Sequence, residues 1–340
     1  MAIVASDRSS VRATLNQPKT WQSAMKSAIR NAGELCRELG LPTEMASKFA
    51  EASFPVFAPR GYVAKMIPGD PVDPLLLQVL PQSDETATIN GFVEDAVGDV
   101  AASRAPGLIH KYNGRVLLIA TGTCAIHCRY CFRRHFPYDT VPRTLEAWRP
   151  AIEQIAGDDS IDEVILSGGD PLTLVDSLLE QLANELERIP HLKRLRIHTR
   201  LPIVIPERVT DELLAWLTGS RLAPIVVVHA NHAREVEGDV AIALSKLLLA
   251  GIPVLNQAVL LRGVNDHIES LVDLSRALVN LRVMPYYLHQ LDRVAGAAHF
   301  EVPIQRGLEL MEQLRSHLPG YAVPRYVQEV AGELSKRILT

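Results

Sequence analysis

From Arg115 onward, short apolar runs alternate along the chain with longer amphipathic segments. Most of the short runs are apolar on both faces, a pattern typical of buried parallel strands. The predicted strands are Val116–Thr121, Glu163–Ser167, Arg194–Thr199, Ile225–Ala230, Pro253–Leu261 and Arg282–Leu288. Helical periodicity predicts helices near Thr144–Ala156, Ser177–Arg188, Thr210–Leu217, Val240–Ala250, Ile268–Asn280 and Ile304–His317.

This alternation amounts to about six βα units in series. Right-handed crossovers place every helix on the outer side of a parallel sheet, so the sheet forms a complete or partial barrel. We predict an α/β fold built on a partial (β/α)6 TIM-like barrel. Functional residues should then follow the carboxyl ends of the strands.

The first part of the chain has a different pattern. Helical periodicity around Trp21–Leu39 and Glu44–Ala52 precedes a segment, Pro55–Pro81, that is punctuated by prolines. Three regions are therefore expected: an N-terminal helical region with its connection (1–105), the barrel (106–320) and a short C-terminal segment (321–340).

The composition is that of a globular protein with balanced charge. The 340 residues are 47% hydrophobic and 22% charged, enough for one large core or two ordinary ones. With 35 basic and 39 acidic residues the formal net charge is -4, so no basic field favours a nucleic-acid partner. Neither Met1–Lys19 nor any later apolar run has the length of a signal peptide or of a membrane helix. We expect a cytoplasmic protein with no membrane partner.

Cysteines are few and clustered. The four are Cys36, Cys124, Cys128 and Cys131, of which the last three directly follow the first predicted strand. This is not a disulfide framework, and a metal site in a reducing compartment explains it better. Three thiolates on one loop can ligate three irons of a cubane cluster and leave the fourth open. A zinc site completed by His127 or His135 is the alternative, and packed core thiols are disfavoured by the polar neighbours.

Other polar residues also stand at predicted strand ends. A glycine-rich turn after the second strand contains Ser167, Gly168, Gly169, Asp170 and Pro171. Its glycines allow the backbone to approach a ligand closely, although such a sequence is more often only a tight turn. Asn256 and Gln257 interrupt an apolar strand, as cofactor contacts or as satisfied core amides. His198, His229 and His289 either line a cavity or are hydrogen-bonded core residues.

The cysteine spacing, with Tyr130 just before the last cysteine, resembles the signature of the radical S-adenosylmethionine (SAM) superfamily. The resemblance implies a [4Fe-4S] cluster on Cys124, Cys128 and Cys131, whose open iron binds SAM. Reduction by an external electron donor then yields a 5'-deoxyadenosyl radical, which the protein orients and shields. The SAM contacts implied are Tyr130, Ser167, Gly168, Gly169, Asp170 and Gln257.

The resemblance narrows to the lysine 2,3-aminomutase family. The similar segments are Gly107–Arg115, Cys131–Arg134, Ser167–Pro171, Asn256–Asn265, Pro285–Asp292 and Gly320–Pro324. The family resemblance implies transfer of the α-amino group of L-lysine to its β-carbon with pyridoxal 5'-phosphate (PLP) as cofactor. The short chain further resembles bacterial members that make (R)-β-lysine, which a separate ligase attaches to elongation factor P.

The same resemblance implies roles for residues near both ends of the barrel. Lys336 would form the Schiff base with PLP, and Lys111, Tyr112 and Arg115 would contact the phosphate. Lys111 replaces an arginine of the family and so offers a point charge instead of a bidentate fork. Without the resemblance, a lysine this near a C-terminus would be expected to be solvated.

Substrate recognition would use fixed charges opposite to those of lysine. Asp292 and Glu329 would bind the ε-ammonium group, and Arg133 would bind the carboxylate. The chain departs from the family where Glu329 replaces Asp and where Ala331–Ser335 replaces a glycine-rich run. Glutamate and arginine aminomutases are alternatives, the paired acids opposing glutamate, and a non-catalytic zinc-binding barrel is a third.

Overall fold

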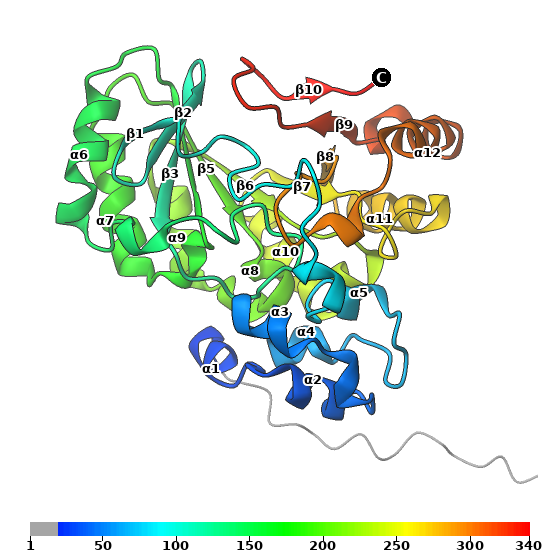
Figure 1. The fold of residues 1–340 in the computed structure, drawn as a ribbon. Helices are drawn as coiled ribbons and strands as arrows, with labels where there is room; N and C mark the ends of the chain where they lie inside the picture. Colours follow the sequence, from blue (N-terminus) through cyan, green and yellow to red (C-terminus); the bar gives the residue numbers. More distant parts are fainter. Residues whose placement is uncertain (1–19) are drawn as a thin grey trace, which may run out of the picture.

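The structure, a computed structural model, describes residues 20–340. The expected lack of a signal peptide in Met1–Lys19 falls outside these residues. The strands form one open sheet in sequence order, and helices cover its outer face (Figure 1). No helix within the described part of the chain is both long and apolar enough to cross a membrane.

The six predicted barrel strands are confirmed as β3 to β8. The strands are β1 Ser103–Ala105, β2 Leu108–Tyr112, β3 Arg115–Thr121, β4 Glu163–Gly168, β5 Arg194–Thr199, β6 Ala223–Val228, β7 Val254–Val259, β8 Met284–His289, β9 Arg325–Gln328 and β10 Arg337–Ile338. Pairing is parallel from β3 through β9 and antiparallel at both ends. Because β1 and β10 are the two edges of the sheet, the barrel is partial, as predicted.

Four strands were missing from the sequence prediction. β1 and β2 extend the sheet beyond β3 by antiparallel pairing, and β9 and β10 extend it beyond β8. Each is short, and β2 and β9 carry polar residues that interrupt any apolar run. Their pairing depends on the neighbouring long strands, which supply the hydrogen-bonding edges, and not on a strong local preference.

The predicted outer helices are confirmed: two have the predicted ends, and the ends of the other four are shifted by at most two residues. They are α6 Leu145–Ala156, α7 Asp176–Glu187, α9 Asp211–Gly219, α10 Asp239–Leu249, α11 Ile268–Asn280 and α12 Ile304–His317, with a short α8 Leu201–Val204 after β5. Thr144 and Thr210 cap α6 and α9 by accepting hydrogen bonds from Ala147 and Leu213. The buried stripe of α7 is Leu179, Leu182, Ala183 and Leu186, at the spacing that faces a sheet.

The N-terminal helical region is more broken than its periodicity predicted. Its helices are α1 Trp21–Lys26, α2 Ala32–Glu38, α3 Lys48–Ser53, α4 Arg60–Val63 and α5 Pro74–Leu77. The helix expected over Trp21–Leu39 is interrupted because Ile29 exchanges two backbone hydrogen bonds with Ala58, each 2.9 Å long. Asn31 then caps α2 by accepting from Glu34. In Figure 1 the blue helices α1 to α4 lie below the barrel.

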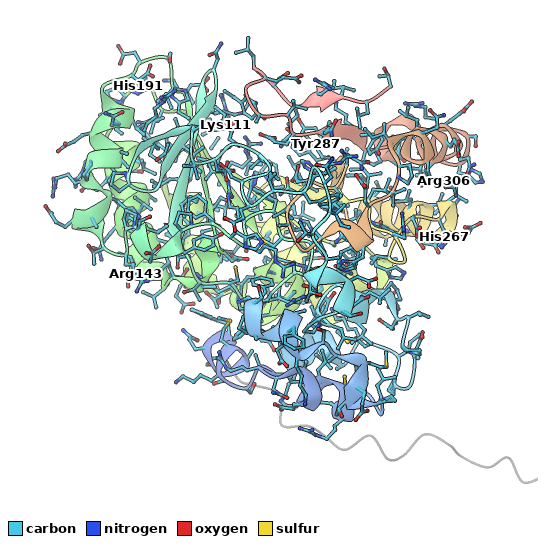
Figure 2. All side chains as sticks on the ribbon, viewed as in Figure 1. Lys111, Arg143, His191, His267, Tyr287 and Arg306 are labelled. Carbon is cyan, nitrogen blue, oxygen red and sulfur yellow. The ribbon has the colours of Figure 1, made fainter. Side chains whose placement is uncertain are left out.

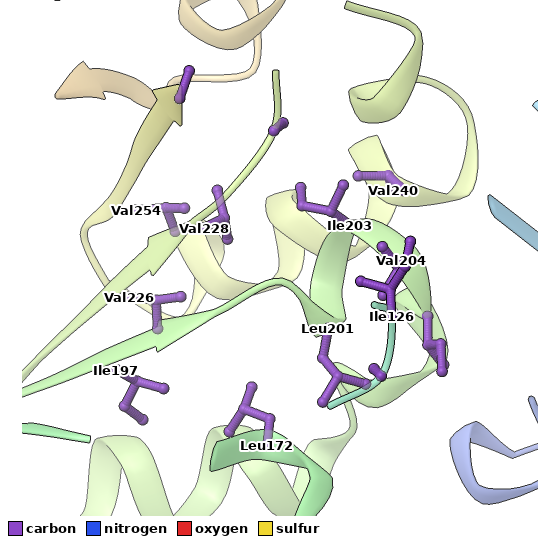
Figure 3. Packing of buried hydrophobic residues seen from close by; sticks show 14 of the residues in the cluster. Ile126, Leu172, Ile197, Leu201, Ile203, Val204, Val226, Val228, Val240 and Val254 are labelled. Atoms are coloured by element: carbon purple, nitrogen blue, oxygen red, sulfur yellow. The ribbon is translucent and has the colours of Figure 1, made fainter. Parts of the chain in front are cut away.

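A continuous apolar core joins the sheet to the helices. Ile197, Val226 and Val228 from neighbouring strands lie near Leu201 and Val240 (Figure 3). All five are at most 1% exposed, and burying a side chain of this kind stabilises the fold by about 1.5–3 kcal/mol. This packing fixes the strand ends, which carry the polar residues described next.

Candidate active site

One cavity, of about 560 Å³, is lined by residues from both ends of the parallel strands. All the site residues predicted from the sequence line it: Lys111, Tyr112, Arg115, Cys124, Cys128, Tyr130, Cys131, Arg133, Ser167, Gly168, Gly169, Asp170, Gln257, Asp292, Glu329 and Lys336. Lys111 and Tyr287, both lining it, lie in the upper central part of Figure 2, whereas Arg306 and His267 lie at the right-hand margin. The fold therefore brings together residues from the two ends of the barrel.

The cysteine loop is held against the N-terminal region by its backbone. The amide of His127 donates to the carbonyl of Phe57, and that of Arg129 donates to Gln78, both at 2.9 Å. The Cys131 amide donates to the Cys128 carbonyl at 3.0 Å, which closes a turn between two of the cysteines. The thiols are thus presented by an ordered loop.

The two histidines that could complete a zinc site each use one ring nitrogen for a backbone carbonyl. His127 Nδ1 lies 2.8 Å from the carbonyl of Pro55, and His135 Nε2 lies 3.0 Å from that of Ala295. Within residues 20–340 no group of three or more His, Cys, Asp or Glu side chains is compact enough for one metal ion. A cubane cluster places its thiolates on different irons.

Two of the thiols, those of Cys124 and Cys131, ionise less readily than an ordinary cysteine. Burial and then the neighbouring Cys128 raise the pKa of Cys131 to about 11. Burial, followed by the charges of Cys131 and Cys128, raises the pKa of Cys124 as well. Thiolates crowded in this pocket are stabilised by a bound metal core, which matches the donor set of an iron–sulfur cluster.

The glycine-rich turn packs directly on the start of the cysteine loop. The amides of Gly169 and Asp170 donate to the carbonyls of Thr121 and Thr123 at 2.8 and 2.7 Å. A Cβ atom at Gly168 or Gly169 would collide with those same carbonyls, and Gly168 has a φ of 124°. Both positions therefore require glycine for packing as well as for any ligand.

Asp170 ties this turn to β5. Its carboxylate accepts hydrogen bonds from the Thr199 hydroxyl and the Arg200 amide, both at 2.7 Å, and from the Leu172 amide at 3.1 Å. Burial raises the pKa of Asp170 to about 6, although these hydrogen bonds oppose the shift. The side chain holds neighbouring strand ends in place, and its predicted contact with SAM would come from what remains exposed to the cavity.

Tyr130 and Gln257 both line the cavity, whereas Asn256 is not among its lining residues. The Tyr130 hydroxyl lies 3.0 Å from His229 Nε2, donates to Gln78 at 3.2 Å and accepts from Asn231 at 2.7 Å. Gln257 lines the cavity. Asn256 is instead a satisfied core amide, which donates to the Ala230 carbonyl and accepts from its amide.

A charge network crosses the opposite side of the cavity, centred on Glu329. Its carboxylate accepts from the Tyr112 hydroxyl at 2.6 Å, contacts Lys336 Nζ and lies 3.5 Å from Lys111 Nζ. Burial opposes ionisation of Glu329, but Lys336, Tyr112 and Lys111 together lower its pKa below the ordinary value. Arg115 lies over the Tyr112 ring at 4.5 Å and adds a further cation.

Asp292 is the most perturbed acid of the site. Burial raises the pKa of Asp292 to about 7, the nearby Lys336 opposing the shift and Glu329 adding to it. A nearby cation favours the charged form of such an acid, so binding a cation beside Asp292 would lower its pKa and ionise it. Asp292 and Glu329 thus line one cavity with pKa values that are shifted in opposite directions.

Asp99 is a site residue that the sequence prediction missed. Its carboxylate accepts from Arg133 Nε and pairs with Lys111 Nζ, both at 2.6 Å, and is 2% exposed. Burial opposes its ionisation, but Arg133 and Lys111 lower the pKa of Asp99. Only the fold reveals this role, because Asp99 precedes the barrel and follows no predicted strand.

The three histidines near strand ends all line the cavity. Burial lowers the pKa of His198, His229 and His289, so all three are neutral. The Nε2 atoms of His198 and His289 are buried and have no hydrogen-bond partner among residues 20–340. They offer polar groups to a bound molecule.

Comparisons with known proteins agree with this geometry. Residues 118–275 match the Radical SAM superfamily. L-lysine 2,3-aminomutase of Escherichia coli (strain K12) is 44% identical over 95% of this chain and 96% of its own length. The enzymes of Haemophilus influenzae and Clostridium subterminale are 42% and 36% identical, over 95% and 92% of this chain and 96% and 76% of their own lengths.

Two solved structures are similar to parts of this chain. They are anSMEcpe with bound AdoMet and Kp18Cys peptide, and the radical SAM enzyme coproporphyrinogen III oxidase (HemN) from Escherichia coli. The first is 12% identical with a TM-score of 0.46, over 59% of this chain and 58% of that one. The second is 13% identical with a TM-score of 0.41, over 66% and 54%.

The partial barrel, the three-cysteine loop and the matched family define the class of protein: this chain is a radical SAM protein. More narrowly, it belongs to the lysine 2,3-aminomutase family. Membership of the superfamily implies a [4Fe-4S] cluster, SAM and a one-electron donor, and the thiol-lined end of the cavity provides residues of the right chemistry.

Proposed function

We propose that this protein converts L-lysine to (R)-β-lysine by moving the α-amino group to the β-carbon, with the cluster, SAM and PLP as cofactors. A single observation carries the proposal: one cavity is lined by three thiols, by the acid pair Asp292 and Glu329, and by Lys336. Relatives 42–44% identical over 95% of this chain are L-lysine 2,3-aminomutases.

The thiol-lined end would hold the cluster and SAM. Cys124, Cys128 and Cys131 ligate three irons, leaving the fourth for SAM, whose reductive cleavage supplies the radical. Tyr130, Ser167 to Asp170 and Gln257 contact SAM. The turn around Gly169 orients the cofactor because its backbone is fixed to the cysteine loop by two short hydrogen bonds.

The opposite end would hold PLP, whose imine π-system supports nitrogen migration when bound. Lys336 forms the Schiff base, and Lys111, Tyr112 and Arg115 receive the phosphate. The cations Lys111 and Arg115 flank Tyr112 on β2 and β3, which places two positive charges at one edge of the cavity. In this reading the C-terminal segment, 321–340, completes the PLP site.

The charges between the two ends would orient lysine. Asp292 and Glu329 bind the ε-ammonium group, while Arg133 binds the carboxylate. Asp99 holds Arg133 through Nε, so the rest of the guanidinium group can face the substrate, with Nη1 3.3 Å from the Ser167 hydroxyl. The paired acids disfavour glutamate, whose terminal carboxylate they repel.

We also propose that the β-lysine serves elongation factor P, to which a separate ligase attaches it. This proposal rests on the resemblance, given above, to bacterial members of the family that make (R)-β-lysine.

Product analysis tests the activity. Anaerobic, reconstituted protein is incubated with SAM, PLP, dithionite and, separately, L-lysine, L-arginine and L-glutamate, and the products are resolved on a chiral column. We expect (R)-β-lysine from lysine alone. Turnover of glutamate or arginine without turnover of lysine would contradict the proposal, and (S)-β-lysine would overturn its stereochemical part.

A further inference from the structure

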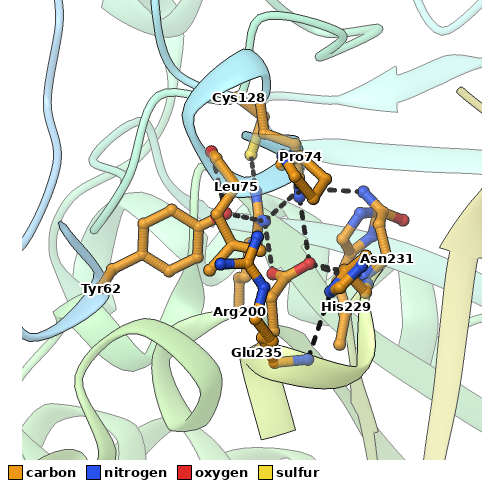
Figure 4. Close-up of polar contacts among 12 residues, drawn as sticks. Tyr62, Pro74, Leu75, Cys128, Arg200, His229, Asn231 and Glu235 are labelled. Carbon is orange, nitrogen blue, oxygen red and sulfur yellow. Dashed lines mark hydrogen bonds and ion pairs between the residues drawn. The ribbon is translucent and has the colours of Figure 1, made fainter. Parts of the chain in front are cut away.

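Arg200 reaches from the end of β5 to one of the cluster cysteines. Its Nη1 donates a hydrogen bond to Cys128 Sγ at 2.7 Å (Figure 4). The residue is 6% exposed, and its backbone amide donates to Asp170 at 2.7 Å. Both its backbone and its side chain are therefore fixed against the thiol-lined end of the cavity.

Glu235 clamps the other branch of the same guanidinium group. Arg200 Nη2 donates to Glu235 at 2.8 Å and to Gln78 at 2.7 Å. Glu235 is fully buried and also accepts from the amides of Asn231 and His232, at 2.9 and 3.0 Å. The ion pair is thus rigid, and it points a positive charge at the sulfur.

Stability alone is a weak reason for this ion pair to be buried. Removing an arginine and a glutamate from water costs free energy that their attraction only partly offsets. The proposed chemistry assigns Arg200 no contact with PLP or lysine. The Arg200 side chain nevertheless donates a hydrogen bond to a thiol sulfur. Donors to ligand sulfurs and nearby charges are among the features that set the potential of an iron–sulfur cluster.

We infer that Arg200 raises the reduction potential of the cluster bound at Cys128, and that Glu235 limits the effect while aiming the guanidinium group. The inference rests on the proposed assignment of Cys128 as a cluster ligand. On reduction the cluster takes one electron from an external one-electron donor, which is oxidised by one electron, and so gains one negative charge. A buried cation hydrogen-bonded to a ligand thiolate stabilises the more negative state.

The test measures the midpoint potential of the reconstituted protein without SAM, by stepwise dithionite reduction followed by electron paramagnetic resonance of the reduced cluster. Arg200→Gln should shift the potential to more negative values. Arg200→Lys, which keeps the charge but loses the fork, should shift it less in the same direction. Glu235→Gln should shift it to more positive values, because the cation is then no longer balanced.

Arg208→Gln is the matched control for loss of a buried arginine. Arg208 is fully buried, but its hydrogen bonds go to Leu172, Leu174 and Asp176 and not to the cysteine loop. The midpoint potential of the cluster in Arg208→Gln should equal that in the unmodified protein. Iron content and circular dichroism establish that each variant is folded and loaded.

The outcomes separate this inference from the proposed function. An unmodified protein that binds no cluster overturns the assignment of the cysteines. A normal cluster whose potential is the same in Arg200→Gln as in the unmodified protein overturns the role of Arg200 alone. Should Arg200→Gln lose its cluster, a zero or negative shift in Glu235→Gln overturns the inference, and a positive shift supports it.

Discussion

Lys336 Nζ contacts the carboxylate of Glu329 across the turn that joins β9 to β10. The register of the two strands, in which Arg337 pairs with Gln328, sets the lysine beside the acid. A carboxylate at this place orients Lys336 until another group replaces it. The contact links the proposed Schiff-base residue to the proposed substrate-binding acid.

Lys336→Ala should abolish the Schiff-base absorbance of bound PLP and the aminomutase activity, and should leave the absorbance of the iron–sulfur cluster intact. The reason is that only Lys336 is assigned the covalent bond to PLP. Lys193→Ala, at an exposed lysine, serves as the control and should change neither signal. An unchanged Schiff-base spectrum in Lys336→Ala would show that another lysine binds PLP.

Glu329→Gln should lower kcat/KM for lysine by roughly 10- to 100-fold, since a hydrogen bond to a charged group contributes about 1.5–3 kcal/mol. Steady-state kinetics at saturating SAM measure the effect. Glu333→Gln, at a neighbouring acid that pairs with Arg337, should leave kcat/KM within a factor of about two. Equal losses in the two variants would contradict a specific role of Glu329.

The value of kcat/KM should decrease as the pH drops below about 7. The raised pKa of Asp292, about 7, means that its carboxyl group is ionised above this pH and neutral below it. Only the ionised form attracts an ammonium group, so kcat/KM should decrease about tenfold per pH unit below the pKa. Asp292→Asn should lower kcat/KM and flatten this limb. A limb that persists unchanged in the variant would assign it to another group.

Gly169→Ala should weaken SAM binding and lower the melting temperature. A Cβ at this position collides with the Thr123 carbonyl, so either the glycine turn or the cysteine loop must move. Gly61→Ala, in α4, is the control because its Cβ would meet no atom within 4 Å. Equilibrium binding of SAM and thermal unfolding measure the two effects, and equal behaviour of the variants would refute the packing argument.

The sequence predicted the barrel well because its strands and helices carry strong periodicity. The segments that form β3 to β8 are long enough and apolar enough to be recognised as strands from the sequence alone. The helix expected over Trp21–Leu39 failed for a different reason. A pair of backbone hydrogen bonds between Ile29 and Ala58 outweighs local helical preference, and pairing between residues so far apart leaves no periodic signal.

The candidate site was predicted where a motif marked it and missed where only folding brings residues together. The cysteine spacing and the glycine-rich turn are local patterns, and their residues line one cavity with Lys336. Asp99, Arg200 and Glu235 belong to no such pattern. Asp99 accepts a hydrogen bond from Arg133, Arg200 donates one to Cys128, and Glu235 accepts one from Arg200. Such supporting residues need the tertiary structure to be seen.

Iron and sulfide content of anaerobically reconstituted cysteine variants tests the central claim most directly. The account predicts a four-iron cluster in the unmodified protein and in Cys36→Ala, whose cysteine is buried in α2 away from the cavity lining. It predicts loss of most iron and sulfide in Cys124→Ala, Cys128→Ala and Cys131→Ala. An unmodified protein that binds no iron or sulfide, or a full cluster in all three variants, would contradict it.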